Sequence, residues 1–275
     1  MGHPAAEEFC RDVDMLRPRI TPCLLVKNGG LVKTVKFGNP KYVGDPINAV
    51  KIFNEKEVDE IIVVDIDASV QRKEPDYALI KNLAAECRMP LCYGGGVKTV
   101  EQVEEIISLG VEKVAISSAA IGNPELIAKA AEVVGNQSIV VVMDVKKVEA
   151  SEPYEIFVHN STKGTGLNPV EFAKTAEQLG AGELVINSID CDGMMKGYDL
   201  QLARKVRDAS NLPITVLGGA GSLKDIAALI ELFGTIGAAA GSLFVFKGAF
   251  RAVLINYPNR SEKDALVPRF RQAVV

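Results

Sequence analysis

The hydrophobic pattern of this chain alternates between two kinds of segment from Ile20 onward. Short apolar segments rich in β-branched residues are separated by longer segments whose apolar positions recur at helical spacing. The short segments show little alternation of polar and apolar residues, which is typical of parallel strands buried on both faces. Eight strands are predicted, over Ile20–Val26, Ile61–Ile66, Leu91–Tyr93, Val114–Ser117, Ile139–Asp144, Leu184–Ser188, Ile214–Leu217 and Ile236–Ala240.

The longer segments carry the start and stop signals of helices. Capping side chains precede the helical pattern at Asp45, Asn123, Asn168 and Asp199, the first three followed directly by proline, and Ser222 with Asp225 resembles a capping box. Glycines 110, 135 and 180 stand where helices are expected to end. Eight strand–helix units without a linker-like stretch predict an α/β fold, the (β/α)8 TIM barrel, in preference to a doubly wound open sheet.

Internal similarity indicates that the barrel is built from two half-barrel repeats. VDEIIVVDIDAS (58–69) resembles AGELVINSIDCD (181–192), and MPLCYGGGV (89–97) resembles LPITVLGGA (212–220), both at an offset of 123 residues. TPCLLVK (21–27) parallels VVVMDVK (140–146) at an offset of 119 residues. Such spacing is typical of a duplicated structural unit, but it does not identify a reaction.

The composition agrees with one globular barrel. Apolar residues make up 48% and charged residues 24% of the 275 residues, which excludes a disordered, collagen-like or coiled-coil chain. We expect residues 1–14 to be an N-terminal extension, residues 15–256 to form the barrel and residues 257–275 to be a C-terminal tail. The net charge of −4 gives no indication of a nucleic-acid partner, and no apolar run is long enough for a membrane span.

The cysteines and histidines argue against a metal site. The five cysteines are odd in number and lack the close pairs of a zinc or redox motif, which together with the absence of a secretory signal favours a cytoplasmic protein. His159 lies in a predicted surface excursion after the fifth strand, and we expect it to face solvent. Neither a metal nor a cofactor is therefore predicted.

Small residues gather where four predicted strands end, which is where a barrel of this kind binds its ligand. They are Gly94, Gly95 and Gly96 after the third strand, Ser117 and Ser118 after the fourth, Gly218, Gly219 and Gly221 after the seventh, and Gly241 and Ser242 after the eighth. Glycine lets backbone N–H groups approach an oxyanion, although it also serves tight turns alone. The matched clusters favour a small molecule with a phosphate at each end.

Carboxylates are also found at the strand ends, namely Asp65, Asp67, Asp144, Asp190 and Asp192. A buried carboxylate there can act as a general acid or base, whereas other aspartates anchor loop backbone. Asp144 is the strongest catalytic candidate, because it ends an otherwise apolar strand and its repeat counterpart is Leu25. We expect Asp190 and Asp192 to lie among the substrate-binding residues.

The first loop, over residues 27–46, is long and basic, with Lys27, Lys33, Lys36 and Lys41. It is either a lid that folds over an anionic ligand, with Lys33 nearest to that ligand, or a solvated basic loop.

Charged residues also stand immediately before four of the strands, at the other end of the barrel. They are Arg19, Glu60, Lys113 and Glu183. Two cations and two anions around the bottom opening could close it as a neutral ring of ion pairs; otherwise they serve stability and solubility.

Eight segments of the chain together resemble one known family. In sequence order they are RITPCLLVK, VVDIDAS, YGGGV, VEKVAISSAAIGNP, VVVMDVK, GTG, GAGELVINSIDCDGMMKGYD and LGGAG. They are similar to the cyclase subunit of imidazole glycerol phosphate synthase. The resemblance covers about residues 15–256 and implies a TIM barrel that receives ammonia from a glutaminase docked on its bottom face. The ammonia would meet a bisphosphorylated ribulosyl substrate at the top. By resemblance, Asp144 is one of two catalytic aspartates, Lys33 and the phosphate clusters bind substrate, and Arg19, Glu60, Lys113 and Glu183 form the ammonia gate.

The departures from this family lie on the substrate face. Leu25 replaces the other catalytic aspartate, Asp67 replaces a threonine, and the stretch from Asp190 to Met194 lacks an arginine and a threonine of the family pattern. Because cyclisation needs one group to take a proton and another to give one, inefficient cyclisation is predicted.

Three functions are consistent with this resemblance. The first is an ammonia-channelling subunit related to divergent paralogues that serve amidino-sugar synthesis for surface polysaccharides, with an ATP-using sugar amidotransferase as a further partner. The second is a true cyclase of histidine biosynthesis in which another group, such as Asp67, replaces the missing base. The third is a non-catalytic activator or scaffold of the glutaminase. The first is our leading hypothesis from sequence.

Overall fold

Eight parallel strands close into a barrel in the computed structural model, which describes residues 17–149, 153–248 and 250–267. The barrel strands are β1 (Arg19–Lys27), β4 (Ile61–Asp65), β5 (Leu91–Gly94), β6 (Lys113–Ile116), β7 (Ile139–Lys147), β10 (Glu183–Ser188), β11 (Ile214–Leu217) and β12 (Gly237–Ala240). Each pairs in parallel with the next in this order, and β12 pairs with β1 to complete the circle. The predicted (β/α)8 barrel is confirmed. The predicted extension, residues 1–14, lies outside the described residues.

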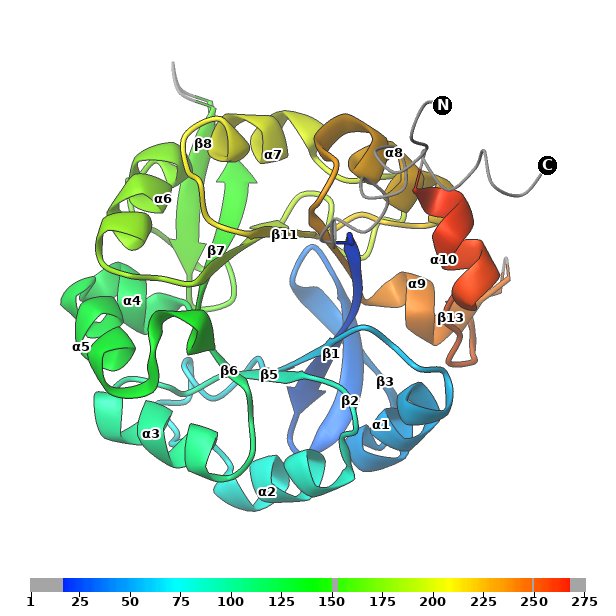
Figure 1. The fold of residues 1–275 in the computed structure, drawn as a ribbon, viewed down its shortest axis with the longest axis horizontal. Coiled ribbons are helices and arrows are strands. Elements are labelled where there is room, and N and C mark those ends of the chain that lie inside the picture. The colour runs from blue at the N-terminus through cyan, green and yellow to red at the C-terminus, as the bar shows by residue number, and fades with distance from the viewer. Residues whose placement is uncertain (1–16, 150–152, 249, 268–275) are drawn as a thin grey trace, which may run out of the picture.

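Helices surround the barrel (Figure 1). They are α1 (Pro46–Glu55), α2 (Tyr77–Glu86), α3 (Val100–Ser108), α4 (Ser118–Gly122), α5 (Glu125–Val134), α6 (Pro169–Gln178), α7 (Leu200–Arg207), α8 (Leu223–Phe233), α9 (Ser242–Val245) and α10 (Arg260–Leu266). Most caps are as predicted; Asp45, for example, accepts a hydrogen bond from the backbone N–H of Asn48. Asn123 is an exception, because it follows the last residue of the short helix α4. The N-cap of α5 is instead Pro124, which makes no side-chain cap hydrogen bond.

The barrel strands bury both of their faces. Outward side chains pack against the helices in the main core, while a second cluster fills the barrel interior: Cys23, Ile62, Cys92, Ala115, Val140 and Val185. Leu25, Val64, Val142 and Leu217 pack against that cluster and lie nearer the ends of their strands. The interior is thus an apolar layer between the two openings of the barrel, as the uninterrupted apolar strands require.

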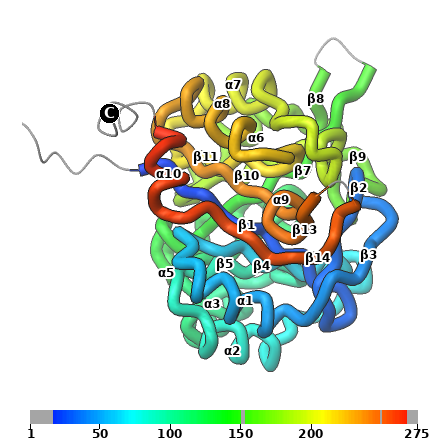
Figure 2. Tube along the Cα trace, turned by 90° about the vertical axis from the view of Figure 1, so that its right-hand side faces the viewer, coloured from blue at the N-terminus to red at the C-terminus, as the bar shows by residue number. Residues whose placement is uncertain are grey.

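Shorter strands extend one end of the barrel. They are β2 (Gly30–Val35) and β3 (Gly38–Gly44) after β1, β8 (Tyr154–Val158) and β9 (Lys163–Gly164) after β7, and β13 (Phe246–Lys247) and β14 (Ala252–Val253) after α9. β2 pairs antiparallel with β1, and β8 pairs antiparallel with β7. In Figure 2, β2, β3 and β8 lie on the right, at the end of the barrel where the strands end, and α10 lies on the left, at the opposite end. We call these two ends the top and the bottom of the barrel.

Helix α10 packs on the bottom of the barrel. The Nζ of Lys263 lies 2.7 Å from a carboxylate oxygen of Asp59, and the hydroxyl of Tyr257 donates a 2.8 Å hydrogen bond to the carbonyl of Ile20. Leu266 is buried. Across the described ranges, no helix has the length and apolar character needed to cross a membrane.

Candidate functional site

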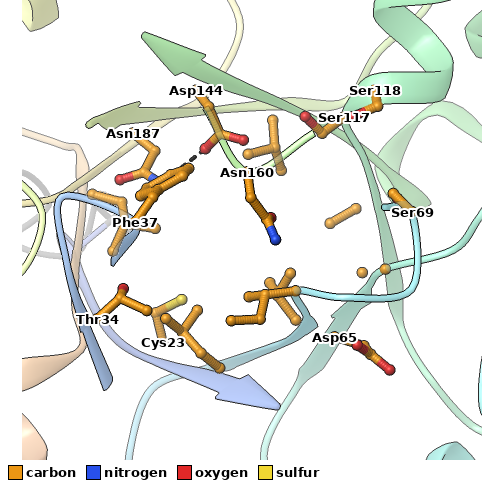
Figure 3. A pocket seen from close by; sticks show the side chains of 18 of the residues that line it. Cys23, Thr34, Phe37, Asp65, Ser69, Ser117, Ser118, Asp144, Asn160 and Asn187 are labelled. Carbon is orange, nitrogen blue, oxygen red and sulfur yellow. Dashed lines mark hydrogen bonds between the residues drawn. The ribbon is translucent and has the colours of Figure 1, made fainter. Parts of the chain in front are cut away.

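A cavity opens at the top of the barrel, where the strands end (Figure 3). Nine of the residues predicted to bind substrate or act in catalysis line it: Lys33, Gly95, Gly96, Ser117, Ser118, Asp144, Asp192, Gly241 and Ser242. Asp190, Gly218 and Gly219 do not belong to its lining. Residues that the sequence did not single out, including Thr34, Phe37, Asn160 and Asn187, complete the wall.

Asp144 presents a carboxylate with a raised pKa to this cavity. Burial, together with the nearby negative charge of Asp192, raises its pKa to about 6, although the hydrogen bond from Asn187 opposes the shift. The Nδ2 of Asn187 donates that bond at 2.9 Å (Figure 3), because β7 and β10 pair in a register that places the two residues side by side. A carboxyl group that titrates near neutral pH can both give and take a proton.

Leu25 occupies the equivalent position in the first half-barrel. It points into the interior of the barrel, packs against the inner apolar cluster and lines the same cavity as Asp144. An alkyl side chain can neither bind nor release a proton. The floor of the cavity therefore carries a carboxylate on one side and an apolar surface on the other.

The long first loop is a hairpin, β2–β3, fixed over one side of the mouth. The hydroxyl of Thr34 donates a 2.9 Å hydrogen bond to Asp192, and the backbone N–H of Phe37 donates to the same carboxylate. The Nζ of Lys33 donates a 2.5 Å hydrogen bond to the carbonyl of Cys23, and burial lowers the pKa of this lysine. The hairpin thus directs a buried ammonium into the site.

Two groups of residues that were predicted to bind phosphate lie on different walls of the cavity. Ser117 and Ser118 lie on one side, and the hydroxyl oxygen of Ser117 is buried without a hydrogen-bond partner among the described residues. Gly241 lies on the other side beside Lys33, since a Cβ at position 241 would come within 2.6 Å of the Lys33 Nζ. The unpaired hydroxyl of Ser117 on one wall and the amino group of Lys33 on the other suit a ligand that carries phosphate at both ends.

The glycines of the two repeats have matching conformations. Gly95 and Gly218 have φ angles of +117° and +92°, and Gly96 and Gly219 have φ angles of +77° and +113°. A Cβ at Gly95 or at Gly218 would lie within 2.7 Å of a backbone carbonyl oxygen of the preceding strand end. Both turns therefore require glycine, as in the alternative interpretation from sequence, and only the first of them borders the cavity.

The other aspartates serve loop structure. Asp190 accepts a hydrogen bond from the backbone N–H of Lys147, and Asp65, which lines the cavity, accepts from two backbone N–H groups of the following turn. Asp67 forms a 3.2 Å ion pair with Lys27 and does not line the cavity. The side chain of Asp67 is therefore not placed to replace the missing base at position 25.

The excursion after β7 brings further polar groups to the mouth. The pairing of β7 with β8 sets Asp144 opposite Phe157, and the chain then turns through His159, Asn160 and Ser161, which all have positive φ. Asn160 points into the cavity (Figure 3). His159 is exposed, as expected, but it also lines the cavity, and its imidazole makes no hydrogen bond within the described part of the chain.

At the bottom of the barrel, the four charged residues predicted from the sequence form one closed ring. Arg19 lies 2.8 Å from Glu60 and 2.7 Å from Glu183, and Lys113 lies 2.7 Å and 2.8 Å from the same two carboxylates. The hydroxyl of Thr215 donates a further 2.6 Å hydrogen bond to Glu183. The ring lies directly below the apolar interior, because each member starts a barrel strand or immediately precedes one.

Mutual attraction favours the charged forms of three members of the ring. Burial disfavours the charged form of Arg19 and of Lys113, but the two glutamates outweigh it and raise both pKa values. Burial likewise opposes the charge of Glu183, whose pKa is nevertheless lowered by Arg19 and Lys113. The formal charges of the ring, two positive and two negative, sum to zero.

The described residues contain no group of three or more histidine, cysteine or acidic side chains that could hold a metal ion. The fold and the two sites define a class of protein: a (β/α)8 barrel with a polar cavity at its mouth and a ring of ion pairs at its bottom. The family model described as "Histidine biosynthesis protein" matches residues 19–251. The chain belongs to this family.

Named relatives extend along almost the whole chain. "Putative imidazole glycerol phosphate synthase subunit HisF" of Leptospira interrogans is 58% identical over 252 residues, which cover 92% of this chain and 99% of that protein. "Putative imidazole glycerol phosphate synthase subunit hisF2" of Pseudomonas aeruginosa is 50% identical over 250 residues, 91% of this chain and 99% of that protein. "Imidazole glycerol phosphate synthase subunit HisF" of Petrotoga mobilis is 41% identical over 230 residues, 84% and 91% respectively. The family predicted from the motifs is confirmed, whereas these names say nothing of polysaccharides.

Proposed function

We propose that this chain is the ammonia-using barrel subunit of a glutamine-dependent synthase of the imidazole glycerol phosphate type. A separate glutaminase subunit docks on the bottom face, and ammonia passes the ring of Arg19, Glu60, Lys113 and Glu183 toward the mouth. The single observation that carries this proposal is the closed ring below an apolar interior. Such an interior favours neutral ammonia over ammonium, because an unpaired buried cation carries a large desolvation cost.

The first candidate reaction is the cyclisation that gives imidazole glycerol phosphate, which agrees with the names of the relatives. The opposed donor groups hold the two phosphates of the substrate, and Asp144 transfers a proton. His159 is the second proton-transfer group in this proposal, since it lines the same cavity and its imidazole makes no hydrogen bond within the described residues. Histidine is a common general acid or base near neutral pH.

The experiment is to supply the purified chain with an ammonium salt and the bisphosphorylated ribulosyl substrate. We expect imidazole glycerol phosphate to form at a rate about 100-fold or more below that of a relative with both aspartates, because one well-placed proton-transfer group is worth that factor. No product above the uncatalysed background would contradict cyclisation, while leaving ammonia transfer open to measurement with the glutaminase bound.

A second candidate is favoured by one observation, the apolar Leu25 where proton transfer is expected. In this case the barrel conducts ammonia to a separate ATP-using amidotransferase that makes amidino sugars. Glutamine-dependent amidation of a sugar by the three components together, without imidazole product, is the expected result. Loss of amidation when only this chain is omitted would support it, and unchanged amidation would contradict it.

A further inference from the structure

Thr21 places a hydroxyl inside the barrel, one inward position above the ring of ion pairs. Inward and outward side chains alternate along β1: Arg19 belongs to the ring and Cys23 to the inner apolar cluster, whereas Ile20 and Leu24, at the even positions, belong to the outer core. Thr21 has the parity of Arg19 and Cys23. It therefore lies on the path between the ring and the mouth.

The hydroxyl of Thr21 lacks a hydrogen-bond partner. The residue is 1% exposed, and its Oγ1 is one of the buried side-chain atoms of the described chain that bond to no protein atom. Thr215 is different, because its hydroxyl binds Glu183 and so supports the ring itself. A buried hydroxyl left unpaired is costly, and such groups in proteins usually hold a small molecule or an ordered water.

The neighbours of Thr21 offer few other hydrogen-bonding side chains to a small polar molecule. Its partner in the β1–β12 pairing is Ala239, and the partner of Arg19 is Gly237, so this side of the passage is lined by the smallest residues. The next inward layer is formed by Cys23 and the other members of the apolar cluster. Between the ring and Asn187 or Asp144 at the mouth, few polar side-chain groups are therefore available.

We propose that Thr21 forms a binding point for one small neutral hydrogen-bonding molecule, which is ammonia during transfer and water at rest. This inference rests on the proposed function. The hydroxyl can donate to the nitrogen lone pair of ammonia or accept one of its hydrogens. It partly replaces the hydration that ammonia loses when it leaves the ring and enters the apolar interior.

The test compares Thr21→Val, which removes the hydroxyl at nearly constant shape, with Thr21→Ser, which keeps it. In the complex with the cognate glutaminase, we expect Thr21→Val to lower glutamine-driven product formation about fivefold relative to glutamine hydrolysis, as for one lost hydrogen bond, and Thr21→Ser to retain it. Product formation from an ammonium salt, which reaches the mouth from solvent, should be equal in all three proteins. Equal glutamine-driven transfer by Thr21→Val and the wild type would overturn the inference.

A crystal structure separates this inference from the proposed function. We expect ordered density within hydrogen-bond distance of the Thr21 hydroxyl in the wild-type chain and none in Thr21→Val. A hydroxyl bonded instead to a protein atom would overturn the inference even if ammonia transfer is observed. Failure of the wild-type complex to transfer ammonia would overturn the proposed function, whereas a molecule bound at Thr21 would still support the binding point.

Discussion

Position 25 decides how much acid–base chemistry the mouth can perform. Leu25 and Asp144 are equivalent in the two half-barrels, and both line the cavity, but only Asp144 can exchange a proton. We expect Leu25→Asp to increase ammonium-dependent cyclisation at least tenfold, because a second proton-transfer group typically contributes a factor of 100 or more when well placed. Steady-state kinetics with ammonium salt measure this.

Leu25→Asn is the matched control for that substitution. It introduces a polar side chain of the same size as aspartate but cannot act as a base at neutral pH. An equal increase in both variants would show that polarity or space, rather than proton transfer, limits the wild-type chain. A rate that does not change in Leu25→Asp would contradict the prediction.

Asp144 should make the stability of the protein depend on pH. Burial raises its pKa from 3.8 to about 6, so the native state binds its proton more tightly than the unfolded state. The resulting stabilisation is complete below about pH 4 and is lost as the pH rises through 6. Asp144→Asn does not titrate at this position and keeps its stability as the pH rises. The difference between its free energy of unfolding and that of the wild type should therefore increase in favour of Asp144→Asn, reaching at most about 3 kcal/mol at pH 7.5.

Urea unfolding at pH 4 and pH 7.5 measures this difference. At pH 4 the two proteins should be about equally stable, which serves as the internal control for the substitution itself. A difference that is the same at both pH values would mean that the carboxyl group is ionised without cost in the native protein.

Among the larger elements, the excursion that contains β8 and β9 most directly affects the mouth. Three consecutive residues with positive φ, His159, Asn160 and Ser161, turn the chain back across the cavity, and such backbone conformations are uncommon for non-glycine residues. We expect His159→Gln to lower the kcat of ammonium-dependent cyclisation at least tenfold and to leave KM nearly unchanged. Lys163→Gln, which alters an exposed residue of β9, is the control and should leave both constants unchanged.

A higher KM with an unchanged kcat would indicate that His159 contributes only to binding. An unchanged kcat and KM would contradict a role for this residue in proton transfer. Steady-state kinetics that measure kcat and KM separately distinguish these results.

Elements defined by a single strong pattern could be predicted from the sequence, and those that depend on tertiary pairing could not. The barrel strands are apolar over most of their length, so their burial is evident without a structure. The strand β2 escaped prediction because its buried residues include Lys33 and Thr34, whose polarity is compensated by Cys23 and Asp192 from distant segments. β8 reads YEIFV and buries every second residue, but Glu155 is its only charged residue, so the sequence does not show the alternation that marks a half-buried strand.

Part of the site could be predicted from the residues at the ends of the barrel strands, which the internal repeat helped to identify. Asp144 and the serine and glycine clusters stand at strand ends, and most of them meet in the cavity. Asn187 could have been found by counting alternate residues from Glu183 along β10, which places it inward beside Asp144. Asp190 and Gly218 were also predicted to bind substrate because they follow barrel strands. In the structure the carboxylate of Asp190 accepts a backbone hydrogen bond, and Gly218 packs closely against the backbone of Ser188, because the loop after a strand can reverse direction within two residues.

On the scale of the whole molecule, the two openings of the barrel have different chemistry. The bottom is closed by four charges that compensate one another, the middle is apolar, and the mouth combines hydroxyl, ammonium and carboxyl groups. The residues that depart from the family pattern, such as Leu25, lie near or beyond the ends of barrel strands, and none of them belongs to the ring. The proposed passage for ammonia and the reaction at its end can therefore be measured separately.

Lys113→Met tests the passage without altering the mouth. The methionine fills similar space but leaves Glu60 and Glu183 with Arg19 as their remaining partner in the ring. Removing one partner from a buried ion-pair network is destabilising, here by about 3 kcal/mol at most, so the folded fraction must be checked by thermal unfolding. We expect product formation per glutamine hydrolysed to fall at least threefold while binding of the glutaminase and activity with ammonium salt remain unchanged.

Lys263→Met is the matched control for this variant. Lys263 is a cation on the same bottom face, but it pairs with Asp59 outside the ring. If both variants lose the coupling between the subunits equally, the effect arises from the docking surface and not from the ring. If Lys113→Met alone loses it, ammonia escapes or is blocked where the ring is broken, since docking and the chemistry of the mouth are both intact in that variant. Full coupling in Lys113→Met would mean that ammonia reaches the mouth by another route.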